Sequence, residues 1–479
     1  MRRAKIVATL GPALDDPDRL RAAIAAGIDV VRLNFSHGTR EEHEERLNRV
    51  HEIAASLNRN VGSLGDLQGP KIRLGLVPDP GVELHDGGEV VLIAGKEELD
   101  RYDDGNGTPV LPVVYEQLAE DVDPGALILM DDGLLRLVVS RVEGDTVTAR
   151  VVAGGPAKSR KGVNLPGVEV SAKSLTEKDL EDVGTMVELG VDWIALSFVR
   201  KPADVIDVRN RVRRLGGEQP IVAKLERPEA IEDLEAIVRA TDAVMVARGD
   251  LGVEVGPERV PAIQKEIIDL ANRIGRPVIT ATEMLDSMIR SPRPTRAEAS
   301  DVANAVFDGT DAVMLSGETA AGRYPVEAVR TMARIIEVAE SSSERLHPVP
   351  PVTGRELPRV VAKAAVQIAE DVDAKAILVY SISGASVQLV SKFRPPRPVV
   401  GLTPDQKPLR RFAMMWGAAG AIVPTKDHSI DLILAAEEVC LEHGYATRGD
   451  AVVVVSGIPG GHGGTNRVMV HRLGETPHG

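Results

Sequence analysis

Eight short apolar runs constrain the fold of this chain more than any other feature of its sequence. They are KIVATL, IDVVRLNF, VGSLGDL, VDWIALSF, PIVAKLE, DAVMVARGD, PVITATEM and DAVMLSGE. Each run is apolar at nearly every position, which is typical of strands in a parallel sheet that is covered on both faces. Helical patterns follow most of the runs, so the eight strand–helix units predict an α/β fold, a closed (β/α)8 or TIM barrel.

Two segments interrupt this pattern. Residues 70–167 contain alternating runs, such as VELHDGGEVVLIAG and GDTVTARVVAGG, between glycine-rich turns. They predict a small antiparallel β domain inserted in a loop, and we expect a β-barrel lid with hinges at Pro70 and Pro166. After about residue 344, helix and strand patterns alternate again, which predicts an open-sheet α/β domain.

The expected organisation is therefore three domains. Residues 1–69 and 168–343 form the barrel, residues 70–167 form the lid, and residues 344–479 form the C-terminal domain. A length of 479 residues agrees with this number, because one hydrophobic core rarely organises so long a chain.

Charge and cysteine content narrow the class of protein. A formal net charge of −14 repels phosphate backbones and anionic lipids, so we expect no nucleic-acid or membrane partner and a local basic pocket for any anionic substrate. The only cysteine, Cys440, is expected to be a small buried residue. The start MRRAKIVATLGP has too short an apolar run for a signal peptide. We expect a cytoplasmic protein.

One pentapeptide, TDAVM, occurs at 241–245 and again at 310–314, followed first by VARGDLG and then by LSGETAAG. Both copies read as barrel strands, and chance similarity of strand composition explains the repeat. Because such barrels carry their chemistry at the C-terminal mouth, the two polar tails are expected to emerge there.

Several polar side chains are expected at this mouth. Glu226 and Asp250 follow adjacent strands and could hold an octahedral Mg²⁺ or Mn²⁺ with positions left for substrate oxygens. Lys224 lies two residues before Glu226, so it points to the same side of its strand. Arg32 and Arg73 offer guanidinium forks suited to phosphate.

Each of these residues also has a simpler explanation. The acidic and basic groups could merely form ion pairs, Arg73 could be a surface residue, and Thr282 could cap a helix. Together, a divalent cation, a phosphate clamp and a hydroxyl at one mouth indicate phosphoryl or enolate chemistry. The chain has no G-x-x-x-x-G-K-[ST] motif, so a nucleotide would not be held by a P-loop.

Eight stretches of the chain resemble the motifs of pyruvate kinases. They are RLNFSHGT (32–39), GPKIR (69–73), KGVNLPG (161–167), AKLE (223–226), MVARGDLG (245–252), TATEMLDSM (280–288), RPTRAEASDVANAV (293–306) and MLSGETAAGRYP (314–325). The resemblance covers essentially the whole chain, and the order of the motifs and the inserted domain agree with it.

The resemblance implies transfer of the phosphoryl group of phosphoenolpyruvate to ADP, followed by protonation of enolpyruvate to pyruvate. It implies that Glu226 and Asp250 bind the Mg²⁺ that bridges substrate oxygens. Lys224 would stabilise the phosphoryl group during transfer, and Arg32 and Arg73 would hold the phosphate.

The same resemblance assigns the carboxylate cradle, the proton path and the nucleotide site. The backbone around Ala247, Arg248 and Gly249 would cradle the substrate carboxylate. The residues implied for the proton path are Thr282 and, behind it, Ser316 and Glu318. The nucleotide would lie between Arg32, His37 and the lid residue Lys161, and closure of the lid would exclude water.

One stretch, DLQGPKIRLG, departs from the pattern of many members. Those members need K⁺, held by oxygens that match Asn34, Ser36, Asp66 and the backbone of Leu67, and they carry Glu where this chain has Lys71. A lysine ammonium can replace the charge of a bound ion, so we expect activity without K⁺. The alternative is that Lys71 is a solvated hinge residue.

The resemblance also places an allosteric site in the C-terminal domain, at SISGASVQ (381–388). Ser381, Ser383, Gly384 and Ser386 could cradle a phosphorylated effector at a helix start. Members that respond to fructose 1,6-bisphosphate usually carry a basic residue where this chain has Ala385, so the identity of the effector stays open. Assembly as a homotetramer is implied by the resemblance alone.

Two other functions remain as alternatives. A pyruvate- or phosphoenolpyruvate-handling aldolase also uses a barrel with Glu and Asp on Mg²⁺, although a lyase needs no nucleotide lid. A non-catalytic metabolite sensor on the same fold would require the loss of a catalytic group, yet Lys224, Glu226, Asp250 and Thr282 are all present.

Overall fold

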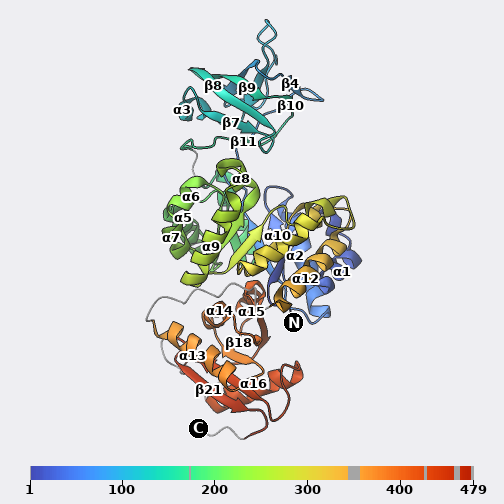
Figure 1. The fold of residues 1–479 in the computed structure, drawn as a ribbon, viewed down its shortest axis with the longest axis vertical. Coiled ribbons are helices and arrows are strands. Elements are labelled where there is room, and N and C mark those ends of the chain that lie inside the picture. Colours follow the sequence, from blue (N-terminus) through green and yellow to red (C-terminus); the bar gives the residue numbers. More distant parts are fainter. Residues whose placement is uncertain (1, 172–173, 343–355, 426–428, 458–463, 476–479) are drawn as a thin grey trace.

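The computed structural model describes residues 2–171, 174–342, 356–425, 429–457 and 464–475. Three bodies lie in a row along the long axis of the molecule, with the barrel in the middle (Figure 1). The inserted β domain lies at one end of the barrel, and the C-terminal domain lies at the opposite end. The predicted boundary between barrel and C-terminal domain, at residues 343 and 344, falls outside the described residues.

The barrel is a closed ring of eight parallel strands in the order β1-β16-β15-β14-β13-β12-β3-β2. The strands are β1 (Lys5–Thr9), β2 (Val30–Asn34), β3 (Gly62–Asp66), β12 (Trp193–Leu196), β13 (Ile221–Leu225), β14 (Ala243–Ala247), β15 (Val278–Ala281) and β16 (Ala312–Leu315). Each of the eight apolar runs contains one of these strands. The predicted TIM barrel is therefore confirmed.

Helices surround this ring. They are α1 (Pro17–Ala26), α2 (Arg40–Ser56), α4 (Glu177–Leu189), α5 (Pro202–Arg214), α6 (Pro228–Glu232), α7 (Leu234–Ala240), α9 (Val260–Ile274), α10 (Arg296–Phe307) and α12 (Pro325–Ser341). The two copies of TDAVM lead into short helices at the mouth, α8 (Arg248–Val255) and α11 (Gly317–Ala320). The polar tails are thus helix starts rather than loops.

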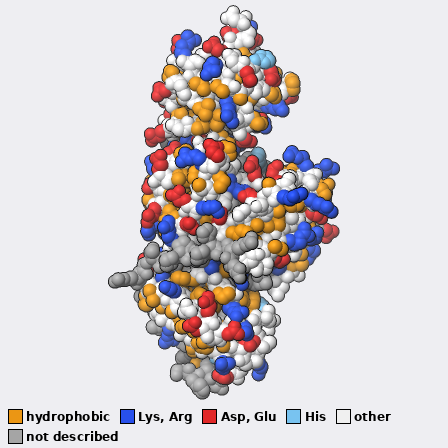
Figure 2. Space-filling model, in the orientation of Figure 1, with side chains coloured by type: hydrophobic (Ala, Val, Ile, Leu, Met, Phe, Trp, Pro, Cys, Tyr) orange, Lys and Arg blue, Asp and Glu red, His pale blue; other side chains and the backbone are white. Residues whose placement is uncertain are grey.

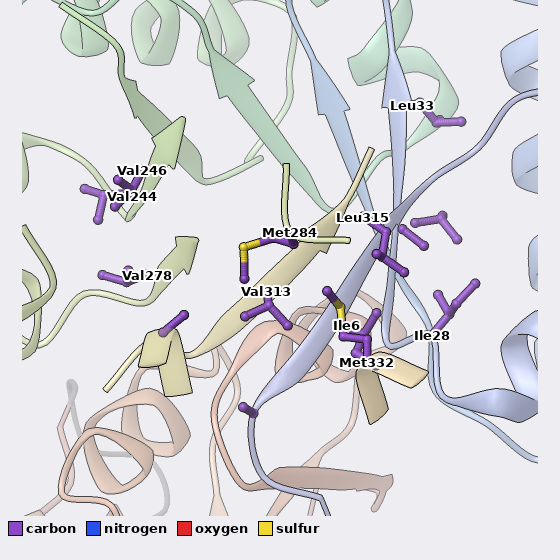
Figure 3. Close-up of a cluster of buried hydrophobic side chains, with 14 of the residues drawn as sticks. Ile6, Ile28, Leu33, Val244, Val246, Val278, Met284, Val313, Leu315 and Met332 are labelled. Carbon is purple, nitrogen blue, oxygen red and sulfur yellow. The ribbon is translucent and has the colours of Figure 1, made fainter. Parts of the chain in front are cut away.

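The two faces of each barrel strand pack differently. Ile6, Leu33, Val244 and Val313 belong to the outer layer, where apolar strand residues meet the helices (Figure 3). Residues at alternating positions of the same strands, such as Val7, Val30, Met245 and Met314, fill the inside of the ring. Because side chains alternate along a strand, inward-facing residues near the strand ends must reach the mouth.

The C-terminal domain closes the other end of the barrel. Its short 3-10 helix η4 (Phe412–Met414) adds Ala413 and Met414 to the apolar core inside the ring. A buried ion pair joins the same two domains: Lys392 Nζ lies 2.7 Å from Asp311 Oδ2, and Arg394 lies 3.2 Å from Asp311 Oδ1. Residues of the C-terminal domain therefore complete the apolar core inside the barrel.

The inserted segment forms a mainly antiparallel β domain, with a six-stranded and a two-stranded sheet. Its strands are β4 (Val82–Leu84), β5 (Glu89–Ala94), β6 (Val110–Val113), β7 (Leu127–Met130), β8 (Leu135–Glu143), β9 (Thr146–Ala153), β10 (Gly155–Ala157) and β11 (Val163–Asn164), with the short helix α3 (Leu118–Asp121). The six-stranded sheet runs β11-β7-β8-β9-β5-β6, and all its pairs are antiparallel except β5–β6. Residues 72–74 bridge its two edges, because Arg73 pairs with Gly162 and Leu74 pairs with Val113.

The C-terminal domain is an open sheet in the order β19-β18-β17-β20-β21. Its strands are β17 (Ile377–Tyr380), β18 (Val399–Thr403), β19 (Ala418–Ile422), β20 (Ala451–Ser456) and the antiparallel edge strand β21 (Arg467–Arg472). Its helices are α13 (Leu357–Asp371), α14 (Ala385–Lys392), α15 (Gln406–Arg411) and α16 (Ser429–Glu442). Cys440 lies buried in this domain, and burial raises the pKa of its thiol to about 11, which agrees with an inert packing residue.

The surface carries both signs of charge. On the face shown in Figure 2, lysine and arginine side chains are interspersed with aspartate and glutamate over all three bodies. None of the helices that the structure describes is long and apolar enough to cross a membrane.

The buried pair at the base of the barrel yields a test. Asp311→Asn leaves the Lys392 and Arg394 cations buried without their carboxylate, so we expect a loss of about 3 kcal/mol or more in the free energy of unfolding. Thermal unfolding followed by circular dichroism measures the effect. The control is Asp373→Asn, at an exposed carboxylate that pairs with Lys375 and Arg397. Equal, small changes in both variants would contradict the role given to the buried pair.

Candidate active site

The inward-facing residues at the strand ends converge on one ammonium group, that of Lys224 on β13. Its Nζ donates to Ser197 Oγ at 2.6 Å and lies 2.9 Å from Glu226 Oε1 and 3.4 Å from Asp66 Oδ1. Burial alone would lower the pKa of Lys224, but Asp66 and Glu226 outweigh burial and raise the pKa above its ordinary value. The group therefore stays positively charged at any physiological pH.

Asp66 on β3 links this lysine to Arg32 on β2. Arg32 Nε donates to Asp66 Oδ2 at 2.6 Å, and Arg32 Nη1 donates to Thr9 Oγ1 at 3.0 Å. Burial would raise the pKa of Asp66, but Lys224 and Arg32 hold it below its ordinary value. Two cations thus share one buried carboxylate, which fixes the positions of both at the mouth.

Glu226 and Asp250 offer oxygens that suit a divalent cation. Glu226 is buried; its Oε2 accepts from Phe198 N at 2.8 Å, whereas its Oε1 lies 2.9 Å from Lys224 Nζ. Burial raises the pKa of Glu226, and the charge of Asp250 on α8 raises it further against the opposing effect of Lys224. A cation between the two carboxylates would remove this repulsion.

The donor set fits magnesium or manganese better than zinc. Among the described residues, no group of three or more His, Cys, Asp or Glu side chains gathers around a common point. Two carboxylates without histidine or cysteine are typical of Mg²⁺, which keeps several positions for water and substrate oxygens.

The loop after β15 carries Thr282 in an unusual backbone conformation. Its φ of +67° is in the left-handed region, which a β-branched residue adopts only when its surroundings hold it there. Thr282 Oγ1 donates to Ala281 O at 2.6 Å and accepts from Gly249 N at 2.8 Å. The hydroxyl thus lies against the start of α8.

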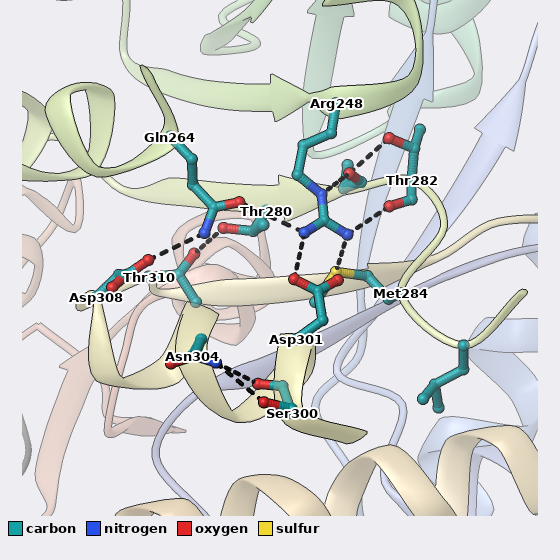
Figure 4. Close-up of polar contacts among 12 residues, drawn as sticks. Arg248, Gln264, Thr280, Thr282, Met284, Ser300, Asp301, Asn304, Asp308 and Thr310 are labelled. Atoms are coloured by element: carbon teal, nitrogen blue, oxygen red, sulfur yellow. Dashed lines mark hydrogen bonds and ion pairs between the residues drawn. The ribbon is translucent and has the colours of Figure 1, made fainter. Parts of the chain in front are cut away.

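Arg248 holds this loop with its side chain (Figure 4). Its guanidinium donates to Thr282 O at 2.7 Å, to Ala281 O at 3.1 Å and to Asp301 Oδ1 on α10 at 2.7 Å. The resemblance gives Arg248 a role only through its backbone, as part of the cradle for the substrate carboxylate. The side chain of Arg248 supports the Thr282 loop instead.

Ser316 and Glu318 lie behind this loop. Glu318 is buried and accepts from Ser316 N at 2.7 Å and from Leu285 N at 3.0 Å, so it joins the tail of β16 to the Thr282 loop. Burial raises the pKa of Glu318. The Ser316 hydroxyl is buried and has no hydrogen-bond partner among the described residues.

A cavity of about 980 Å³ separates the lid from the barrel mouth. Its lining includes Lys71 and Arg73 of the lid connection and Ser36 and His37 of the barrel. Arg73 Nη1 donates to Arg160 O at 3.1 Å, within the lid. Two of the predicted phosphate and nucleotide ligands, Arg73 and His37, therefore face one cavity.

The other predicted nucleotide ligands lie elsewhere. Lys161 Nζ is 2.8 Å from Asp131 Oδ1, within the lid, and it is not among the residues that line the cavity. Arg32 forms an ion pair with Asp66. In this conformation Arg32, His37 and Lys161 do not form one binding surface.

The predicted monovalent-cation site is only partly assembled. Asn34 Oδ1 accepts from Ser36 N at 3.2 Å, and the carbonyl of Leu67 accepts from Ser197 Oγ at 2.7 Å. The ion pair that Lys71 forms is with a different residue: its Nζ lies 3.3 Å from Asp250 Oδ1. Its positive charge is thus placed beside a predicted metal ligand.

The predicted effector loop forms the start of α14. Gly384 N donates to Ser381 Oγ at 3.0 Å and Ala385 N to Ser383 Oγ at 3.4 Å, while Thr465 Oγ1 donates to Ser386 Oγ at 2.5 Å. The serine hydroxyls therefore already have partners in the protein.

The comparison with known proteins decides the family. The family model described as "Pyruvate kinase, barrel domain" matches residues 1–329, and the one described as "Pyruvate kinase, alpha/beta domain" matches residues 359–471. The chain belongs to the pyruvate kinase family. A pyruvate kinase of Mycobacterium tuberculosis is 48% identical over 479 residues, which cover 99% of both chains. One of Corynebacterium glutamicum is 45% identical over 480 residues, covering 99% of this chain and 98% of the relative.

Membership of the pyruvate kinase family makes this chain a phosphotransferase. Sequence reasoning missed some residues that surround its site. Asp301, which holds Arg248, lies inside the quoted stretch RPTRAEASDVANAV but received no role. Arg227 and Glu254 were also missed, although one follows Glu226 and the other lies one helical turn after Asp250.

The support of Thr282 can be tested at Asp301. Asp301→Asn removes the charge that orients Arg248, so the Thr282 loop should lose its fixed position and turnover should fall roughly ten- to a hundredfold. Steady-state phosphotransferase kinetics measure this fall, with the exposed Glu266→Gln on α9 as control. Wild-type turnover in Asp301→Asn would show that the loop does not need this ion pair.

Proposed function

We propose that this chain transfers the phosphoryl group of phosphoenolpyruvate to ADP, giving pyruvate and ATP, with Mg²⁺ or Mn²⁺ as cofactor and without a need for K⁺. The observation that carries the proposal is the Lys224 ammonium, held charged beside Glu226 at the barrel mouth of a pyruvate kinase family member. Phosphoryl transfer needs mainly positioning and positive charge, and this mouth offers both.

Lys224, Arg32 and Arg73 are proposed to bind the phosphate. Lys224 is held by Ser197, Glu226 and Asp66, so its charge needs little reorganisation when negative charge develops on the transferred group. Arg73 would enter from the lid side of the cavity, which it already lines. The bond from the enol oxygen to phosphorus breaks, and a new bond to the terminal phosphate oxygen of ADP forms.

Glu226 and Asp250 are proposed to hold the divalent cation. When bound, Mg²⁺ or Mn²⁺ supplies charge neutralisation for substrate oxygens. The burial of Glu226 and the repulsion between the two carboxylates support this assignment.

The carboxylate of the substrate is proposed to bind the backbone at Ala247, Arg248 and Gly249, at the positive end of α8. Thr282 lies against this backbone through its hydrogen bond from Gly249 N. We propose that it passes a proton to the methylene carbon of the enolate left by the transfer. Ser316 and Glu318 would complete the path.

The lid is proposed to close over the nucleotide. Lys161 would then leave Asp131 and join His37 and Arg32 on the phosphates of ADP, and closure would keep water away from the transferred group. The large cavity between the lid and the barrel supports such a movement.

The remaining proposals concern organisation. The domains are proposed to be residues 1–69 with 168–343, 70–167 and 344–479, in a cytoplasmic homotetramer. A phosphorylated effector is proposed to bind at Ser381, Ser383, Gly384 and Ser386, at the start of α14. Small rearrangements of the serine hydroxyls would free the backbone N–H groups for an anion.

The role of Lys224 has a direct test. Lys224→Met should lower turnover by about a hundred- to a thousandfold while the fold stays intact, because one fixed charge at the transferred group is lost. A coupled assay of ADP-dependent pyruvate formation measures it, with circular dichroism as the check on folding. The exposed Lys407→Met is the matched control. An unchanged rate refutes the assigned role, and pyruvate formed without ADP would favour the aldolase alternative.

K⁺ independence is tested with tetramethylammonium as the only monovalent cation. Wild-type turnover should be nearly the same in this salt and in K⁺, because Lys71 supplies a fixed charge beside Asp250. Lys71→Glu should be slow in tetramethylammonium and recover on addition of K⁺. If the wild-type rate collapses without K⁺, the proposal about Lys71 is wrong.

A further inference from the structure

The strands of the lid connect to the barrel next to the two proposed metal ligands. On the side where the chain leaves the lid, Asn164 ends β11 and Val168 follows it. Both contact one buried pair of charged side chains, Arg227 and Glu254. None of these four residues has a role in the proposed reaction.

Glu254 and Arg227 lie directly behind the metal ligands in sequence and space. Arg227 follows Glu226 at the end of β13, and Glu254 lies four residues after Asp250 on α8, which places it one helical turn along the same face. Arg227 Nη1 lies 2.8 Å from Glu254 Oε1, and both side chains are at least nine-tenths buried. One ion pair therefore ties the strand of Glu226 to the helix of Asp250.

The lid joins this pair at the same oxygen atom. Asn164 Nδ2 donates to Glu254 Oε1 at 3.0 Å, and Arg227 Nη2 donates to the carbonyl of Val168 at 3.2 Å. The second oxygen, Glu254 Oε2, is buried and has no hydrogen-bond partner among the described residues. A shift of the lid connection therefore has to move Glu254 or break its hydrogen bond.

The other lid connection is linked to Glu226 through Phe198. A Cβ on Gly69 would lie 2.7 Å from the ring of Phe198, so the chain passes very close to this residue, and Phe198 N donates to Glu226 Oε2. A small cavity of about 40 Å³ between the two connections is lined by Pro70, Asn164, Phe198, Arg227 and Glu254, among others.

We infer that Glu254 is a positioning residue through which the lid and the divalent-cation site influence each other. Glu254 forms a cluster with Asn164 and Arg227. This cluster sets the relative position of Glu226 and Asp250, so a movement of the lid changes that position. This inference rests on the proposed function, because it takes Glu226 and Asp250 as the metal ligands.

Stability alone does not account for the cluster. A buried ion pair adds little to stability compared with apolar residues of the same size, because desolvation of the charges offsets their attraction. Partners that orient metal ligands, by contrast, commonly change metal affinity about ten- to a hundredfold when they are altered. A positioning role and a packing role therefore predict different results.

The first experiment measures Mn²⁺ binding to the full chain without substrates, by the electron paramagnetic resonance signal of free Mn²⁺. Glu254→Gln keeps the size and a hydrogen-bond acceptor for Asn164 but removes the charge, so we expect Mn²⁺ affinity to fall about tenfold. Asn164→Ala keeps the ion pair and should weaken binding by a smaller factor. Because both side chains act through Oε1, the double variant should lose less than the product of the two effects.

The matched control is Asp242→Asn, which breaks the ion pair to Arg209 at 2.7 Å before β14. It should leave Mn²⁺ affinity unchanged. Wild-type affinity in Glu254→Gln, or an equal loss in Asp242→Asn, overturns the inference while leaving the proposed metal site intact. If the wild-type protein binds no Mn²⁺ at all, the metal assignment fails, and the inference fails with it.

The second experiment measures the reverse effect by hydrogen–deuterium exchange of residues 163–170. Because coupling between two sites is reciprocal, Mn²⁺ should slow exchange of this connection in the wild-type protein and should not do so in Asn164→Ala. Equal slowing in both proteins would show that the lid connection does not respond through Asn164, and would contradict the coupling.

Discussion

A buried ammonium group shared by two carboxylates is the interaction on which the rest of the site depends. Lys224 lies 2.9 Å from Glu226 and 3.4 Å from Asp66, and neither carboxylate could stay charged in this position without a cation beside it. Asp66 in turn orients Arg32. The positive charge at the mouth and the orientation of one metal ligand thus depend on the same lysine.

The barrel makes this arrangement possible because it brings distant segments together at fixed spacing. Asp66 and Lys224 lie on β3 and β13, and Ser197 directly follows β12, which lies between them. Their inward direction follows from the alternation of side chains, with apolar residues such as Leu64 and Val222 two positions earlier inside the ring. At the opposite end, Met414 of the C-terminal domain fills the ring, so the polar cluster rests on a packed core.

The strands and the strand-end residues could be predicted because they follow from local patterns. Apolar runs of six to nine residues identified all eight strands, and a spacing of two placed Lys224 and Glu226 on one side of β13. The targets of long side chains could not be predicted in this way. Arg248 turns to Thr282 and Asp301, and Lys161 turns to Asp131, because these partners come close only when the barrel or the lid has folded.

In the lid, too, the strands could be predicted from local patterns but the contacts of individual side chains could not. Its strands were visible as alternating runs, but the contact of Asn164 with Glu254 joins residues that are 90 positions apart. Lys71 was expected among the oxygens of a monovalent-cation site, whereas its ammonium lies nearest Asp250. Both contacts depend on how the lid sits on the barrel, which no local pattern encodes.

The most direct test of this account is anomalous X-ray diffraction at the manganese edge from crystals soaked in Mn²⁺. The account predicts one strong anomalous peak within bonding distance of both Glu226 and Asp250, with Lys224 beside it. A peak bound to neither carboxylate, or two carboxylates that face different cavities with no ion between them, would contradict it.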